Sequence, residues 1–164
     1  MSTPGTYALL LHLAAPQTVV VGALGAQDLP PGWYLYLGSA RGPGGLEARL
    51  ARHRREIDKR KHWHIDFVRG VMELVEVWTA AGAERQECAW AAAAAELPGA
   101  VVVVSRLGAS DCRCPTHLFH YARRLNSSEF EPLIQAQLRC EHLGTGGGRK
   151  WADAYTCERG RPRN

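Results

Sequence analysis

The sequence predicts an α/β (α+β) fold, in which a small mixed or antiparallel central sheet is flanked by helices. Three observations lead to this prediction. The chain has 164 residues, of which 46% are apolar and 22% charged, so it is long enough for one core. Short apolar segments of strand character recur along it, and alanine-rich or amphipathic segments of helical character lie between them. Alternation of this kind is typical of a sheet covered by helices.

Three strands are expected in the first forty residues. Residues 7–13 (YALLLHL), 18–22 (TVVVG) and 33–38 (WYLYLG) are rich in β-branched, aromatic and leucine side chains. Gly25, Pro30, Pro31 and Gly32 separate the second strand from the third. The middle strand therefore lies between two segments that each contain tyrosine.

A glycine loop at residues 42–45 then leads into an expected helix over 46–57, in which Leu46 and Leu50 lie one turn apart. Residues 72–79 (MELVEVWT) alternate apolar and polar side chains, which predicts a strand with one covered face. The alanine-rich residues 83–97 predict a helix that ends at Pro98-Gly99, and VVVV at 101–104 predicts another strand. A turn and a short aromatic strand are expected within 110–121.

The character of the chain changes after Asn126, and two parts are expected: a domain over residues 1–125 and a C-terminal part over 126–164. In the second part, residues 128–142 can form a helix, and a glycine-rich basic tail follows. No apolar run is long enough to cross a membrane, and no basic leader precedes the first apolar stretch. Five scattered cysteines are typical of a reducing compartment. The expected location is the cytoplasm, with no membrane partner.

Positive charge is concentrated in one segment. The formal net charge is +4, but residues 41–61 alone hold eight basic and three acidic side chains, a local net of +5. A solvated helix face is one explanation, but so dense a patch favours a polyanion such as nucleic acid. The candidate contacts to DNA are Arg41, Arg52, Arg55, Lys61, His62, His64 and His117.

An ordered set of motifs gives a more specific indication. Gly5-Thr6-Tyr7 begins the first strand, Tyr36-Leu37-Gly38 ends the third, and SARGPGGLEARLARH leads into the basic helix. Together these resemble the GIY-YIG nuclease superfamily. With HWHID at 62–66, QECA at 86–89 and GASDCRCPTHLFH at 108–120, the chain looks like a GIY-YIG-related family of unknown function. The resemblance covers about residues 4–124 and implies hydrolysis of phosphodiester bonds with one divalent ion.

The resemblance also implies a catalytic set. Tyr7 and Tyr36 match the tyrosines of the two motifs, Arg49 the helix arginine, His53 the position one turn later, and Glu87 the metal-binding glutamate. An arginine and an ion neutralise charge on phosphate oxygens, and a phenol or imidazole accepts a proton from water. A lone carboxylate ligand favours Mg²⁺ or Mn²⁺.

Simpler explanations stand beside this one. Tyr7 and Tyr36 could be ordinary strand aromatics, Arg49 a surface cation and Glu87 a solvated helix residue, with Glu84 as an alternative metal ligand. The chain also departs from the superfamily in two ways. An insertion containing TVVVGALGAQDLPP separates the tyrosine motifs, and the usual core asparagine has no match, so that Ser110, Asp111 or His117 are the candidates to replace it.

A second constellation comprises His62, His64, Cys112, Cys114 and His117. Four of these side chains could hold a structural Zn²⁺, but two cysteines one residue apart are an unusual pair of zinc ligands. Roles in capping, hydrogen bonding or lining a groove are the favoured alternative.

The expectation for function is a metal-dependent endonuclease that hydrolyses phosphodiester bonds in DNA during repair or processing. The alternative is a catalytically inactive GIY-YIG-like DNA-binding module, which delivers a partner DNA-repair protein.

Overall fold

The structure is a computed structural model, and it describes residues 2–55 and 61–143. The elements in chain order are β1 (Gly5–Leu13), β2 (Gln17–Val20), the 3-10 turn η1 (Gly22–Leu24), β3 (Ala26–Leu29), β4 (Gly32–Ala40), α1 (Gly45–Arg54), α2 (His64–Arg69), β5 (Glu73–Ala81), α3 (Glu87–Glu96), β6 (Leu118–Tyr121), α4 (Ser127–Ile134) and β7 (Arg139–His142).

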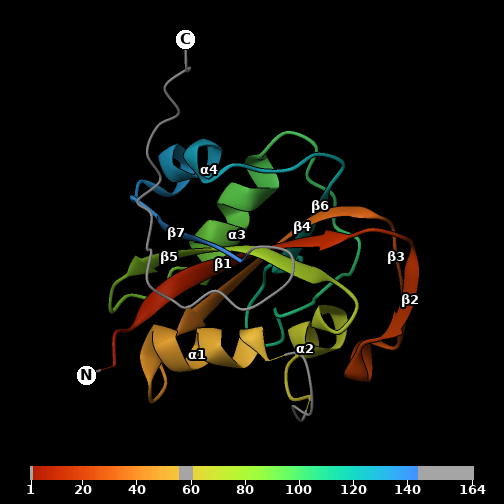
Figure 1. Ribbon diagram of the computed structural model, residues 1–164, viewed down its shortest axis with the longest axis horizontal. Coiled ribbons are helices and arrows are strands. Elements are labelled where there is room, and N and C mark those ends of the chain that lie inside the picture. The colour runs from red at the N-terminus through yellow and green to blue at the C-terminus, as the bar shows by residue number, and fades with distance from the viewer. Residues whose placement is uncertain (1, 56–60, 144–164) are drawn as a thin grey trace.

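The central sheet has five strands in the order β6-β4-β1-β5-β7, and every pair in it is antiparallel. Helices α1 and α2 lie against one face, and α3 and α4 lie against the other (Figure 1). The predicted α+β class with a central antiparallel sheet flanked by helices is therefore confirmed.

Strand β1 forms the middle of the molecule, because both of its edges are paired and both of its faces are covered. Successive side chains of a strand point to opposite faces. Leu9 and Leu11 accordingly belong to the core under α1 and α2, whereas Ala8 and Leu10 belong to the core under α3 and α4. A nearly uninterrupted apolar strand is what burial on both faces requires.

The insertion between the tyrosine motifs is a hairpin of two strands, where the sequence predicted one. Strands β2 and β3 pair with each other as a separate two-stranded sheet, which lies at the right of Figure 1. The prediction missed β3 because its residues, AQDL, are polar and mostly exposed. The hydrogen bond from Thr18 Oγ1 to Asp28 Oδ1, 2.7 Å long, joins the two strands.

Three other predicted elements are wrong in part. Residues 101–104 form no strand, only one bridge between Val101 and His120, because Val101 and Val102 point to solvent. The helix expected over 83–97 begins only at Glu87, and the helix expected over 46–57 ends at Arg54. Helix α2, which begins at His64, was not predicted.

The helix expected over residues 128–142 is confirmed only for its first half. Helix α4 ends at Ile134, because the next residue, Gln135, has a left-handed backbone conformation (φ 52°, ψ 36°) that cannot continue a right-handed helix. Residues 139–142 form strand β7 and extend the sheet beside β5. The glycine-rich basic tail lies outside the described residues.

The described part of the chain holds no helix that is both long and apolar enough to span a membrane.

Candidate functional site

Two tyrosines and a histidine meet on the face of the sheet that α1 covers. Tyr7 on β1 is opposite Gly38 on β4, so Tyr7 and Tyr36 are diagonal neighbours on one face, with ring centroids 6.4 Å apart. The Tyr7 hydroxyl and His53 Nε2 are joined by a hydrogen bond of 2.7 Å. All three side chains are buried. Residues 46 positions apart in the sequence thus form one polar contact inside an apolar core.

Gly38 makes this arrangement possible. A β-carbon at Gly38 would lie 2.5 Å from Tyr7 Cζ and 2.5 Å from the Tyr7 hydroxyl oxygen. Atoms of this kind pack at about 3.5–4.0 Å, so the Tyr7 ring occupies the space that any other residue would fill. Gly5 similarly admits Leu46, since its β-carbon would lie 2.6 Å from Leu46 Cδ1.

Arg49 lies one helical turn before His53 on α1, and Trp63 fixes its position. The Arg49 guanidinium carbon is 4.0 Å from the centroid of the Trp63 ring, in a cation–π contact. No described carboxylate pairs with Arg49. Arg52 also lies over this ring, at 4.5 Å, but it forms an ion pair of 2.6 Å with the buried Asp66. Arg49 therefore keeps a positive charge that can meet an anion, whereas the charge of Arg52 is neutralised.

Glu87 is the first residue of α3 and is only 4% exposed. Its Oε1 accepts a hydrogen bond from Arg85 Nε, and Arg85 also donates to Asp111 Oδ2 at 2.7 Å. Its Oε2 is buried and has no hydrogen-bond partner among the described residues. A buried carboxylate oxygen without a partner is costly, and a hard divalent cation is a ligand that would satisfy it. The donor set therefore fits the expected Mg²⁺ or Mn²⁺.

These groups surround one pocket of about 380 Å³. Tyr7, Tyr36, Arg49 and Glu87 all line it, although they come from β1, β4, α1 and α3. The remaining lining residues include Trp63, Arg85, Ser110, Asp111 and His117. All three candidates for the missing asparagine are therefore at the pocket, and Glu84, the alternative ligand, is exposed and outside its lining.

Burial sets the protonation of the tyrosines. The pKa of Tyr7 is raised well above its ordinary value by burial first and by neighbouring Tyr36 second, while Arg49 lowers it. The pKa of Tyr36 is raised by burial as well. Both phenols are consequently protonated at neutral pH. At the pocket rim, hydrogen bonding to Arg85 lowers the pKa of Asp111, which remains ionised.

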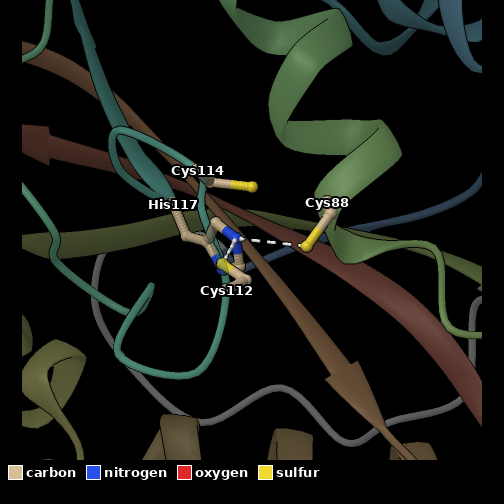
Figure 2. Close-up of side chains that lie close together, drawn as sticks. All are labelled: Cys88, Cys112, Cys114 and His117. Carbon is tan, nitrogen blue, oxygen red and sulfur yellow. Dashed lines mark hydrogen bonds between the residues drawn. The ribbon is translucent and has the colours of Figure 1, made fainter.

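A group of sulfur and nitrogen atoms lies next to this pocket; we call it the thiol–histidine cluster and define it as Cys88, Cys112, Cys114 and His117. One ligand atom of each lies within 4.8 Å of the others, so the four could hold a metal ion. Figure 2 shows Cys88 approaching from α3, and the other three from the loop that precedes β6. His62 and His64, the other members of the predicted constellation, are not in it.

The protonation states of the cluster also follow from its surroundings. Burial first, and then the neighbouring thiols, raise the pKa of Cys114 to about 12. Burial likewise lowers the pKa of His117, which is 2% exposed, so its imidazole is neutral at neutral pH. A neutral imidazole is the form that binds metals.

The structure divides the expected DNA contacts into two groups. Arg41, Arg55, Lys61 and His62 are exposed. The others are engaged within the protein: Arg52 with Asp66, His64 as acceptor from the Gly108 N–H at 3.2 Å, and His117 in the thiol–histidine cluster. Lys59 and Arg60, which contribute to the basic segment, lie outside the described residues.

Sequence reasoning missed three residues of this region. Trp63 and Arg85 gave no signal beyond their presence in or beside the HWHID and QECA motifs, because their partners are distant in sequence. Cys88 is the third residue of QECA, and the sequence did not predict it as a ligand. The signal available in the sequence was that Cys88 directly follows Glu87 and that two more cysteines lie close together further along the chain.

Comparison with curated proteins gave no match to this chain, and comparison with solved structures gave none either. A protein-family model does match, over residues 6–138, which covers most of the chain and both the pocket and the thiol–histidine cluster. The chain thus belongs to the family described as "Domain of unknown function DUF123".

Proposed function

We propose that this protein is a metal-dependent endonuclease of the GIY-YIG type that hydrolyses phosphodiester bonds in DNA. The observation that carries the proposal is the convergence of Tyr7, Tyr36, Arg49 and Glu87 on one pocket, with His53 bonded to Tyr7. These five residues resemble the catalytic set of that superfamily in type and order. Their approach from four different elements makes coincidence a poor explanation.

Tyr7 and His53 supply the group that accepts a proton from water. In the imidazole tautomer with its proton on Nδ1, His53 Nε2 accepts a hydrogen bond from the Tyr7 hydroxyl. Tyr7 can then take a proton from an attacking water while passing its own to His53. Because burial raises the pKa of Tyr7, its deprotonated form is disfavoured before the reaction. Concerted transfer of a proton through Tyr7 to His53 avoids forming that anion.

The remaining steps balance without another reactant. Water attacks phosphorus, the bond to the leaving oxygen breaks, and the leaving oxygen takes a proton from solvent. Arg49, held on Trp63, stabilises the charge that develops on the phosphate oxygens. Tyr36 positions the phosphate or the water from β4.

Glu87 is the proposed ligand of the divalent ion. Its Oε2 is buried and unpartnered among the described residues, and the Asp111 carboxylate lines the same pocket. A bound Mg²⁺ or Mn²⁺ would add positive charge beside the phosphate oxygens.

Exposed basic side chains support DNA as the substrate. Arg41 directly follows β4 and Arg55 directly follows α1, the elements that supply Tyr36 and Arg49 to the pocket, and Lys61 and His62 directly precede Trp63. Binding to a polyanion through such residues should weaken steeply with salt, because each phosphate contact releases counterions.

The test is cleavage of labelled single-stranded, duplex and branched DNA in Mg²⁺ or Mn²⁺. The native chain is compared with Tyr7→Phe, Arg49→Ala and Glu87→Gln. Each change should reduce the cleavage rate by roughly 100-fold or more while DNA binding persists, since acid–base and charge-stabilising groups contribute that much.

Matched controls keep this test specific. Tyr34→Phe alters another buried tyrosine of β4, whose hydroxyl donates to the Pro30 carbonyl at 2.6 Å and which is not among the pocket residues. Glu84→Gln alters the exposed glutamate three positions before Glu87. Both variants should cleave at the native rate. Cleavage that survives all three pocket substitutions would refute this site.

A second candidate function is a DNA-binding module that has lost turnover. The observation that favours it is that the Arg85 guanidinium donates hydrogen bonds to both Glu87 and Asp111. Its positive charge thus lies beside the carboxylates where the divalent ion of a nuclease would bind. Salt-sensitive binding of DNA without cleavage, by the native chain and by Arg85→Ala alike, would favour this candidate.

A further inference from the structure

We propose that the thiol–histidine cluster binds one Zn²⁺ ion, with Cys88, Cys112, Cys114 and His117 as its four ligands. This site is separate from the divalent ion proposed at Glu87, and the inference does not rest on nuclease activity. It follows from the distances within the cluster, from the way the protein holds the loop, and from the chemistry of the donor atoms.

The distances are those of a tetrahedral zinc site with only small adjustments left. With zinc–sulfur bonds of about 2.3 Å and zinc–nitrogen bonds of about 2.0 Å, tetrahedral ligand atoms lie about 3.5–3.8 Å apart. His117 Nε2 lies 3.5 Å from Cys112 Sγ and 3.9 Å from Cys88 Sγ, as drawn in Figure 2. No pair among the four exceeds 4.8 Å. Side-chain movements of about 1 Å or less would close the site around an ion.

The backbone of the loop is organised so that both cysteines of Cys112-Arg113-Cys114 face the same point. The Arg106 guanidinium donates to the Cys112 carbonyl at 2.6 Å and to the Cys114 carbonyl at 2.7 Å. The Arg106 N–H donates to the Pro115 carbonyl at 2.7 Å. These bonds fold the loop back on itself and hold the backbone that carries the two thiols.

His117 is held at the other end of the same loop. Its backbone N–H donates to the Leu107 carbonyl at 2.8 Å, and its carbonyl accepts from the Leu37 N–H of β4 at 2.9 Å. The imidazole is thereby anchored to the central sheet, and Cys88 is anchored by the first turn of α3. The ligands are thus fixed by two rigid elements before any metal binds, which favours a closed structural site.

The donor atoms select zinc. Three cysteines, which release their thiol protons to solvent when they bind the ion, and one imidazole are soft or borderline ligands, which suit Zn²⁺ and make Mg²⁺ a poor fit. An iron–sulfur cluster needs room for several iron and sulfide atoms between its cysteines, and ligand atoms this close leave room for one ion. The proposed site therefore differs from the Glu87 site in both ligand type and metal.

The consequence is a link between the two sides of the pocket. Cys88 follows Glu87 directly on α3, and Cys112 follows Asp111 directly in the loop. An ion bound by both cysteines would tie α3 to the loop and hold the Glu87 and Asp111 carboxylates at the same pocket. We assign zinc this positioning role and no part in the chemistry.

The test begins with the metal content of the full chain, purified without added metal and dialysed. We expect about one zinc per chain, retained through dialysis and removed by a strong chelator, with a lowered Tm for the stripped protein. X-ray absorption at the zinc edge of the native protein should show three sulfur ligands at about 2.3 Å and one nitrogen at about 2.0 Å. This measurement needs no variant, so misfolding cannot obscure it.

Variants then assign the ligands. Cys88→Ser, Cys114→Ser and His117→Asn should each lower the zinc content or raise the rate of its loss to a chelator at least tenfold. The matched control is His120→Asn, because His120 lies three residues further on, contacts the Tyr34 ring edge-on with the ring centroids 4.9 Å apart, and lies 3.0 Å from the Pro31 carbonyl. It should retain the native zinc content.

Two outcomes would overturn the proposal. One is a folded native chain that takes up neither Zn²⁺ nor Co²⁺ at stoichiometric concentration. The other is zinc that is present but bound without sulfur, or unaffected by the three ligand substitutions. Neither outcome depends on DNA, so the zinc site and the nuclease activity can fail independently.

Discussion

Gly38→Ala is the substitution for which the structure gives the most definite expectation. Gly38 lies opposite Tyr7 in the β1–β4 register, and a β-carbon there would be 2.5 Å from both Tyr7 Cζ and the Tyr7 hydroxyl oxygen. Because such atoms pack at about 3.5–4.0 Å, one of the two residues must move by about 1 Å.

Neither residue 38 nor Tyr7 can move easily. Tyr7 is 2% exposed, and its hydroxyl is hydrogen-bonded to His53. Strand β1 is paired on both edges, so it cannot move away from β4 without breaking its ladder with β5. Overpacking in such surroundings costs about 1–3 kcal/mol in the free energy of unfolding. For a chain of this size that corresponds to a fall in Tm of about 2–12 °C.

The assay is denaturant unfolding followed by tryptophan fluorescence, together with thermal unfolding. Gly42→Ala is the control, because nothing lies within 4 Å of its added β-carbon. It should change stability by less than about 0.5 kcal/mol. In a Tyr7→Leu background, which lacks the atoms that clash, the cost of Gly38→Ala should largely disappear.

The reasoning would be refuted by either of two results. Gly38→Ala might unfold at the native denaturant concentration, or it might cost as much with Leu at position 7 as with Tyr. In both cases the close approach of the Tyr7 ring would not be the reason for glycine at this position.

Two further predictions concern the supports of the site and of the second core. Asp66→Ala should destabilise the protein by about 1–3 kcal/mol, because it removes an ion-pair partner of Arg52 and the acceptor for the His62 and Trp63 N–H groups. Calorimetry would measure this loss, and Glu73→Ala, which removes an exposed carboxylate, should not show it. Hydrogen bonding to Arg123 lowers the pKa of Glu129, which caps α4, so its stabilisation is present above the unfolded pKa and is lost as pH falls through the folded pKa. Glu129→Gln should therefore cost about 0.5–1 kcal/mol at pH 7, and this loss should shrink as the pH falls below the unfolded pKa, as followed by urea unfolding; a loss that does not change with pH would contradict this.

The sequence by itself determined the class of the fold and most of its strands. The apolar run of β1, the aromatic run of β4 and the alternation in β5 each produced a strand where periodicity predicted one. These signals are local, because burial on one or both faces is written into consecutive residues. The polar strand β3 and the strand β7 carried no such signal, since pairing with a neighbour decided them.

The candidate residues of the pocket were likewise named from the sequence, through motifs whose order resembles a known superfamily. The geometry of these residues could not be predicted from the sequence. The bond between Tyr7 and His53, the place of Arg49 on Trp63 and the unpartnered oxygen of Glu87 all depend on contacts between distant segments.

The thiol–histidine cluster illustrates the same limit most clearly. The spacing Cys112-x-Cys114 argued against a shared ion, because zinc sites more usually use cysteines separated by two residues, and two cysteines separated by one rarely both reach the same ion. Only the folded chain brings Cys88 of α3 to this loop, whose backbone Arg106 holds through hydrogen bonds to the Cys112 and Cys114 carbonyls. Local pattern thus determined which elements form, and tertiary packing decided which side chains meet, because side chains far apart in sequence are brought into contact only when the whole sheet is assembled.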